Sequence, residues 1–211
     1  MEEELKTKES DVVLKAIDNF KKTDISMNVN KRKTLLQVFD KISEIESDKR
    51  NIENPDPKST AKGFFQFNNP SVPTAIQRYK NLTNTNPEWL QNLDKNQNIM
   101  SLDYDQQRAL AIANIAFSKG DSINEMNNIA SSGRVEGNAD VYELYRKYHH
   151  TDTKKDPITK EAIQNALRKL KVSLPNSPGG IYEDMSIETQ PGETMKNLPT
   201  PKISVDFPTK Q

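Results

Sequence analysis

Residues 42–67 read ISEIESDKRNIENPDPKSTAKGFFQF, and the interpretation of the whole chain depends on this stretch. It begins with the apolar spacing of an amphipathic helix and continues as a polar loop that contains two prolines. It closes on the sequence GFFQF at residues 63–67. Proline disfavours helix in the residue before it, so the middle of the stretch is predicted to be a loop. One acid, Glu46, stands where the helical pattern ends.

The helix predicted over residues 31–47 places Glu46 on its apolar side. Leu35, Phe39 and Ile42 precede the acid at helical spacing, so all four residues fall on one stripe. Burial favours the protonated form of a carboxyl group, and cleavage of a glycosidic bond needs a protonated acid beside the leaving oxygen. Glu46 is therefore a candidate general acid. The alternative is a solvated glutamate at the end of a helix.

Composition narrows the classes of function. The 211 residues carry 30 Lys and Arg against 30 Asp and Glu, so no overall field attracts nucleic acid or an anionic membrane. The absence of cysteine excludes disulfides, thiolate nucleophiles and cysteine-based zinc sites, and we expect no cofactor. The N-terminal sequence MEEELKTKES has no apolar core, which predicts no secretion signal. No apolar run is long enough to predict a membrane span.

The remaining patterns predict a mainly α fold. Asp103 is the expected N-cap of a central, alanine-rich helix that ends at Gly120, and Asp156-Pro157 is the expected start of the last helix. The helices are expected at 10–22, 31–47, from Ser71, from Pro87, 103–120, 121–130, 138–150 and from Pro157 to about 172.

Three segments follow from these patterns. Residues 1–30 are predicted to form an N-terminal helix and linker, and residues 31–172 the main domain. Residues 173–211 hold six of the twelve prolines and show no helical stripe, which predicts an extended or disordered arm. Its scattered apolar residues suit docking on other proteins.

The order of short motifs resembles the soluble lytic transglycosylase and goose-type lysozyme family. Glu46-Ser47 is similar to the Glu-Ser of that family, and Gly63-Phe64-Phe65-Gln66 to the Gly-Leu-Met/Phe-Gln that follows its Asn-Pro loop. Asn98-Ile99 and the run ALAIAN at 109–114 resemble its central-helix motifs, although Ala113 stands where the family has a tyrosine. The resemblance covers about residues 35–150 and implies a lysozyme-like helical domain.

The resemblance also implies roles for individual residues. Glu46 would be the catalytic acid and then base, as carried over from the family. The expected substrate-binding residues are Ser47, Gln66, Phe67, Asn114, Tyr142 and Tyr145. For Gln66 and Phe67 the alternatives are a polar residue that satisfies a buried loop and a core ring.

Two further groups of side chains have both a possible functional role and a structural one. The family lacks a second catalytic acid because the N-acetyl group of the substrate can assist, giving a 1,6-anhydro product. Candidates for a second acid, as a hydrolase would need, are Asp48, Glu53, Asp56 and Asp103, each with a loop or capping alternative. Adjacent His149 and His150 point in different directions on a helix, which disfavours a metal site; with Tyr142, Tyr145 and Tyr148, His149 fits either a sugar-binding wall or packing.

The sequence thus favours a peptidoglycan-cleaving glycosidase that cuts the MurNAc-GlcNAc bond, as lytic transglycosylase or lysozyme. Without an export signal, such an enzyme is expected as a virion protein in a phage tail or among ejected proteins, acting on the host cell wall. Its partners would be glycan strands and, through residues 173–211, other tail or baseplate proteins. The alternative is a structural virion protein whose lysozyme-like domain has weak or no activity.

Overall fold

A computed structural model describes residues 9–20, 28–118, 122–149 and 159–172. The described part is helical, as the sequence predicts. Its α-helices are α1 (Glu9–Phe20), α2 (Val29–Ser47), α3 (Val72–Thr83), α4 (Glu88–Asn96), α5 (Tyr104–Ala116), α6 (Ser122–Ser132), α7 (Ala139–Leu144) and α8 (Lys160–Leu170). Short helical turns lie at η1 (Asn69–Ser71), η2 (Ile99–Ser101) and η3 (Tyr145–His149), and η3 is a π-helical turn.

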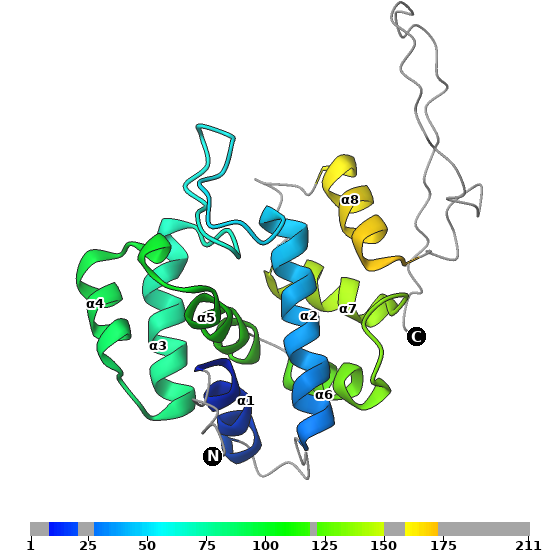
Figure 1. The fold of residues 1–211 in the computed structure, drawn as a ribbon, viewed down its shortest axis with the longest axis horizontal. Helices are drawn as coiled ribbons and strands as arrows, with labels where there is room; N and C mark the ends of the chain where they lie inside the picture. Colours follow the sequence, from blue (N-terminus) through cyan, green and yellow to red (C-terminus); the bar gives the residue numbers. More distant parts are fainter. Residues whose placement is uncertain (1–8, 21–27, 119–121, 150–158, 173–211) are drawn as a thin grey trace, which may run out of the picture.

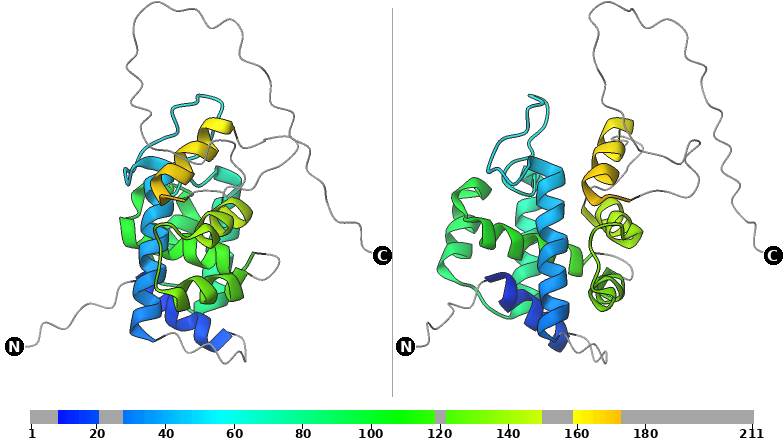
Figure 2. Two further views of the ribbon diagram at one scale, coloured as in Figure 1. Left: turned by 90° about the vertical axis from the view of Figure 1, so that its right-hand side faces the viewer. Right: turned by 45° about the vertical axis from the view of Figure 1, so that its right-hand side comes forward.

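Helix α5 is the centre of the core, which confirms its predicted place. All its residues from Ala109 to Ala113 are 0 % exposed, and the alanines among them allow neighbouring helices to approach closely. Helices α1 and α3 pack on α5, and α2 lies between this group and the group of α6, α7 and α8 (Figures 1 and 2). Glu46 lies near the C-terminal end of α2.

The N-terminal helix belongs to the same core. Val13, Leu14 and Ile17 are buried against it, and a polar cluster fixes the start of the helix. The hydroxyl of Ser10 donates to Asp105 Oδ1 at 2.6 Å and accepts from Arg108 Nε at 3.0 Å. Ser10 is 0 % exposed, so α1 is joined to α5 by buried hydrogen bonds as well as by apolar contacts.

Capping confirms one predicted helix boundary and corrects another. Asp103 caps α5, and its side chain and that of Gln106 form a reciprocal capping box. Helix α5 ends at Ala116, earlier than predicted, and Gly120 lies outside the described residues. Helix α8 begins at Lys160, because the Thr159 side chain accepts from the Ala162 amide at 3.1 Å, and the predicted start at Asp156-Pro157 lies outside the described residues.

The loop between α2 and α3 projects from one end of the bundle (Figure 1). Its base is held by isolated bridges that pair Lys62 with Glu53 and with Phe67. The proposed arm, 173–211, lies outside the described residues. No helix in the described ranges is both long and apolar enough to cross a membrane.

Candidate active site

The end of α2 carries Glu46 into a nearly closed environment. Leu35, Phe39 and Ile42 are each 0 % exposed, and the Glu46 side chain on the same stripe is 12 % exposed. The helix stops two residues later because Asp48 takes a left-handed backbone conformation with φ of 52°. The predicted position of the acid on the buried face is therefore confirmed.

Tyr145 contacts Glu46 from the other side of the site. Its hydroxyl hydrogen-bonds the Glu46 carboxylate, and its side chain is 4 % exposed. Burial, and then the negative charge of Glu46, raise the pKa of Tyr145 far above its usual value, so this hydroxyl keeps its proton and donates a hydrogen bond to the acid. Tyr142, buried at 5 % exposure, lies close enough to Tyr145 to add to the same effect.

His149 is the second group from η3 at the acid. Its Nε2 lies 3.8 Å from Glu46 Oε1 and 3.0 Å from the carbonyl oxygen of Phe65. The imidazole stacks on Tyr145 with ring centroids 6.0 Å apart. A π-helical turn is uncommon and frequent at functional sites, and here it presents Tyr145 and His149 to one carboxyl group.

Ser47 connects the end of α2 with the GFFQF segment, residues 63–67. Its hydroxyl donates to the Phe64 carbonyl at 2.9 Å and accepts from the Arg50 amide at 3.2 Å. Ser43, one turn earlier, donates to the same carbonyl at 3.0 Å. Ser47 is 4 % exposed, so in this structure its hydroxyl positions the segment opposite the acid.

Gln66 closes the projecting loop. Its side-chain amide donates to the carbonyls of Gly63 at 2.9 Å and Ile52 at 3.1 Å, and its oxygen accepts from Asn54 at 3.0 Å. Both amide hydrogens are thus used inside the loop. This geometry matches the alternative that Gln66 satisfies a buried loop.

Phe67 and Asn114 also make internal contacts. Phe67 is 4 % exposed, and its backbone amide and carbonyl both pair with Lys62. The side-chain oxygen of Asn114 accepts from Arg78 at 2.7 Å, which joins α5 to α3. Of the residues expected to bind substrate, the structure places Tyr145 in direct contact with Glu46. Ser47 lies beside Glu46 in sequence and faces the GFFQF segment.

Gln107 is a site residue that no sequence motif indicated. It is 0 % exposed, and its oxygen accepts from the Phe64 amide at 2.8 Å. Its nitrogen lies within hydrogen-bonding distance of the carbonyls of Ile99 and Leu102 and of Asn51. This single side chain holds the GFFQF segment on α5. Its neighbour Gln106 has the same chemistry, so the local sequence does not distinguish them.

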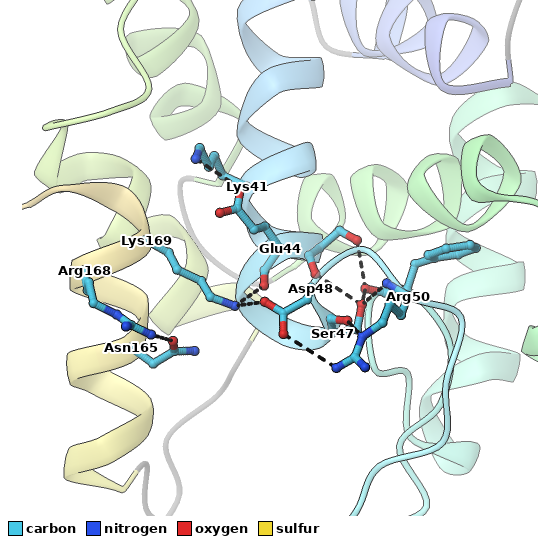
Figure 3. A network of polar contacts seen from close by, with 10 residues as sticks. Lys41, Glu44, Ser47, Asp48, Arg50, Asn165, Arg168 and Lys169 are labelled. Atoms are coloured by element: carbon cyan, nitrogen blue, oxygen red, sulfur yellow. Dashed lines mark hydrogen bonds and ion pairs between the residues drawn. The ribbon is translucent and has the colours of Figure 1, made fainter. Parts of the chain in front are cut away.

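The candidate second acids have structural partners. Glu53 pairs with Lys62 at 3.0 Å, Asp56 accepts from the Lys58 amide at 2.9 Å, and Asp103 caps α5. Asp48 pairs with Lys169 of α8 at 2.5 Å, and Lys169 also donates to the Glu44 carbonyl (Figure 3). Each candidate therefore fits the loop or capping alternative.

The structure also has a cavity away from Glu46. A cavity of about 370 Å³ is lined by Gln37, Asp40, Lys41, Lys49, Val135 and Glu136, and Glu46 is not among its lining residues. Within the described ranges, no three His, Cys, Asp or Glu side chains are grouped so that they could hold a metal ion.

Comparisons with known proteins give no relative. Searches against protein-family models, curated proteins and solved structures each found no significant match. The geometry around Glu46 is therefore the main evidence on function.

Proposed function

We propose that this protein is a lysozyme-like peptidoglycan glycosidase that cuts the MurNAc-GlcNAc bond with Glu46 as general acid and then base. One observation carries the proposal. A carboxyl group on an apolar helix face, 12 % exposed, is held by a tyrosine that keeps its proton and lies beside a histidine. A carboxyl group removed from water and oriented by neighbours suits proton transfer to a glycosidic oxygen.

Tyr145 could replace the tyrosine that the family resemblance leads us to expect at position 113. Ala113 stands where the resemblance leads us to expect a tyrosine, and it is 0 % exposed in the core. Tyr145 reaches the acid from a different helix and supplies a hydroxyl at Glu46. The supporting hydrogen bond is thus available although the motif residue has changed.

The partners of the candidate second acids favour a transglycosylase reaction, which needs no second acid. Since Asp48, Glu53, Asp56 and Asp103 all have partners in an ion pair, loop or cap, the proposed reaction uses the N-acetyl group of MurNAc instead of a second acid. Glu46 gives its proton to the leaving oxygen while the acetamido oxygen bonds to C1. The Glu46 carboxylate then takes the proton of the C6 hydroxyl, whose oxygen displaces the acetamido group and forms the 1,6-anhydro bond. No water is consumed.

The proposed setting is a phage particle, in which the protein acts on the host cell wall. Residues 173–211 would dock it on other tail or baseplate proteins. This part of the proposal rests on the composition of the segment.

The test is digestion of purified peptidoglycan by the full chain, with mass spectrometry of the soluble products. We expect muropeptides with 1,6-anhydro ends, and reducing ends would instead identify a hydrolase. Glu46→Gln should lower product formation by about 100-fold or more. The matched control is Glu44→Gln, which removes a carboxylate from the same helix turn, paired with Lys41, and should retain activity. Equal activity of Glu46→Gln and the wild type would refute the role of Glu46.

A second function is favoured by the internal contacts. The polar groups of Ser47 and Gln66 form hydrogen bonds within the protein, and Phe67 is buried. These residues therefore suit a structural virion protein as well as a sugar-binding groove. That reading predicts no soluble product from several peptidoglycan types, together with stoichiometric incorporation into a particle.

A further inference from the structure

The orientation of the His149 ring is fixed by contacts on several sides. Nε2 lies 3.0 Å from the Phe65 carbonyl oxygen. A carbonyl carries no proton, so Nε2 must be the protonated nitrogen that donates this bond. The ring stacks on Tyr145 and meets the rings of Phe65 and Phe67 edge-on, with centroids 6.4 and 6.5 Å away. The His149 side chain is 8 % exposed.

The same nitrogen faces the acid. Nε2 is 3.8 Å from Glu46 Oε1, which is too long for a hydrogen bond but within the range of an ion pair. In the neutral ring the one proton is on Nε2, which donates it in the hydrogen bond to the Phe65 carbonyl oxygen. A second proton, taken up by the other ring nitrogen, Nδ1, gives the ring a positive charge. The charge beside Glu46 can therefore change with pH.

We propose that His149 is a positioning residue whose charge controls the protonation state of Glu46. The positive ring favours the ionised carboxylate, and the neutral ring removes that preference. Because such coupling is reciprocal, the Glu46 carboxylate stabilises the charged form of His149 to the same extent. The importance of this control for catalysis rests on the proposed function, whereas the coupling itself does not.

Other charges near the site have partners of their own. On the turn of His149, Arg146 pairs with Glu143 and Lys147 with Glu125. At the end of α2, Glu44 pairs with Lys41 and Asp48 with Lys169 of α8. In the loop base, Lys62 pairs with Glu53. Among the described residues, Tyr145 is a titratable group stacked on the ring, and it stays neutral. Glu46 is thus the charge expected to dominate the titration of His149.

The experiment follows the ring protons of His149 by NMR through a pH titration of the full chain. The sequence has two histidines, so His150→Gln assigns the signals. Glu46→Gln should lower the titration midpoint of His149 by about one pH unit, the effect of removing a nearby opposite charge. Glu44→Gln should leave it unchanged. An unchanged midpoint in folded Glu46→Gln would overturn the proposal. If that variant does not fold, Glu46→Asp, which withdraws the carboxylate by one methylene, should lower the midpoint by a smaller amount.

Activity supplies an independent readout. In an active protein, His149→Gln removes the positive charge, so the pH above which cleavage declines should rise by about one unit. An unchanged profile would overturn the control by His149. Absence of any cleavage product with the NMR shift intact would instead refute the proposed function and leave the coupling established.

Discussion

The oxygen of the Gln107 side chain occupies the place where a Cβ on Gly63 would stand. Gly63 has φ of +84°, a conformation that other residues rarely adopt, and Gln107 uses the free space to accept the Phe64 amide at 2.8 Å. The glycine and the buried glutamine therefore depend on each other. Together they hold the GFFQF segment beside the acid.

The first prediction concerns this pair. Gly63→Ala adds both backbone strain and a clash with Gln107, so it should destabilise the protein by about 3 kcal/mol. Gly133→Ala is the control, because Gly133 has φ of +65° with nothing near its Cβ position. It should cost about 1 kcal/mol for strain alone. Urea unfolding measures both, and equal losses would contradict the close packing of Gln107 on Gly63.

The second prediction concerns acid stability. Burial opposes ionisation of Asp105, but hydrogen bonds from Ser10 and Arg108 outweigh it and hold the pKa of Asp105 below its ordinary value. A lowered pKa in the folded state gives stability that is present above the unfolded pKa, about 4, and is lost as pH falls through the folded value. Unfolding free energy should thus fall below about pH 4, and less steeply in Asp105→Asn.

The same substitution has a cost at neutral pH. Asp105→Asn weakens the pairing of Arg108, which is 8 % exposed, and should lose about 2 kcal/mol. Asp94→Asn is the control, because Asp94 is 49 % exposed and pairs with Lys80 at the surface. Its loss should be much smaller. Similar losses in the two variants would show that the buried network around Ser10 has no special weight.

A third prediction concerns alkaline pH. Burial raises the pKa of Tyr79, Tyr104 and Tyr145. A nearby carboxylate raises the pKa of each tyrosine further: Glu9 acts on Tyr79, Asp40 on Tyr104, and Glu46 on Tyr145. These tyrosines should stay protonated in the folded protein at about pH 10, where tyrosine ionises in the unfolded chain. Since the unfolded state then releases protons more readily, stability should fall above that pH. Tyrosinate absorbance checks this, and ionisation of all six tyrosines before unfolding would contradict it.

The fourth prediction concerns the attachment of α8. Lys169 donates to the Glu44 carbonyl and pairs with Asp48, so it fixes α8 to the end of α2 (Figure 3). Lys169→Met keeps most of the aliphatic stem and removes the charge. Amide exchange in residues 160–170 should become faster, and the difference should shrink at high salt if it is electrostatic. Lys171→Met removes only a contact with Glu136 from a side chain that is 69 % exposed, and should change exchange little.

The helices and the place of Glu46 could be predicted from sequence because they depend on local patterns. The stripe of Leu35, Phe39 and Ile42 determines which face of α2 is buried, and Asp103 determines where α5 begins. Helix α8 begins at Lys160 because the Thr159 hydroxyl provides the cap, whereas the proline and preceding acid at 156–157, which resemble a helix start, lie outside the described residues.

The contacts of the acid could not be predicted with the same certainty, because they join distant parts of the chain. Gln107 and Gln106 are indistinguishable by local pattern, and the tertiary fold decides which one is buried. His149 lies at the end of a polar, aromatic helix, where the sequence is compatible with either a sugar-binding wall or packing. The π-helical turn that brings it to Glu46 has no signature in the sequence.

Glu46 lies far from Tyr145 and His149 along the chain, and this separation matters during biosynthesis. The acid and most of its helix leave the ribosome long before the turn that supplies its partners. During that interval Glu46 has neither the tyrosine hydroxyl nor the imidazole beside it. The proposed site can therefore form only after residue 149 has been synthesised, and a chain that ends before η3 would lack both partners of Glu46.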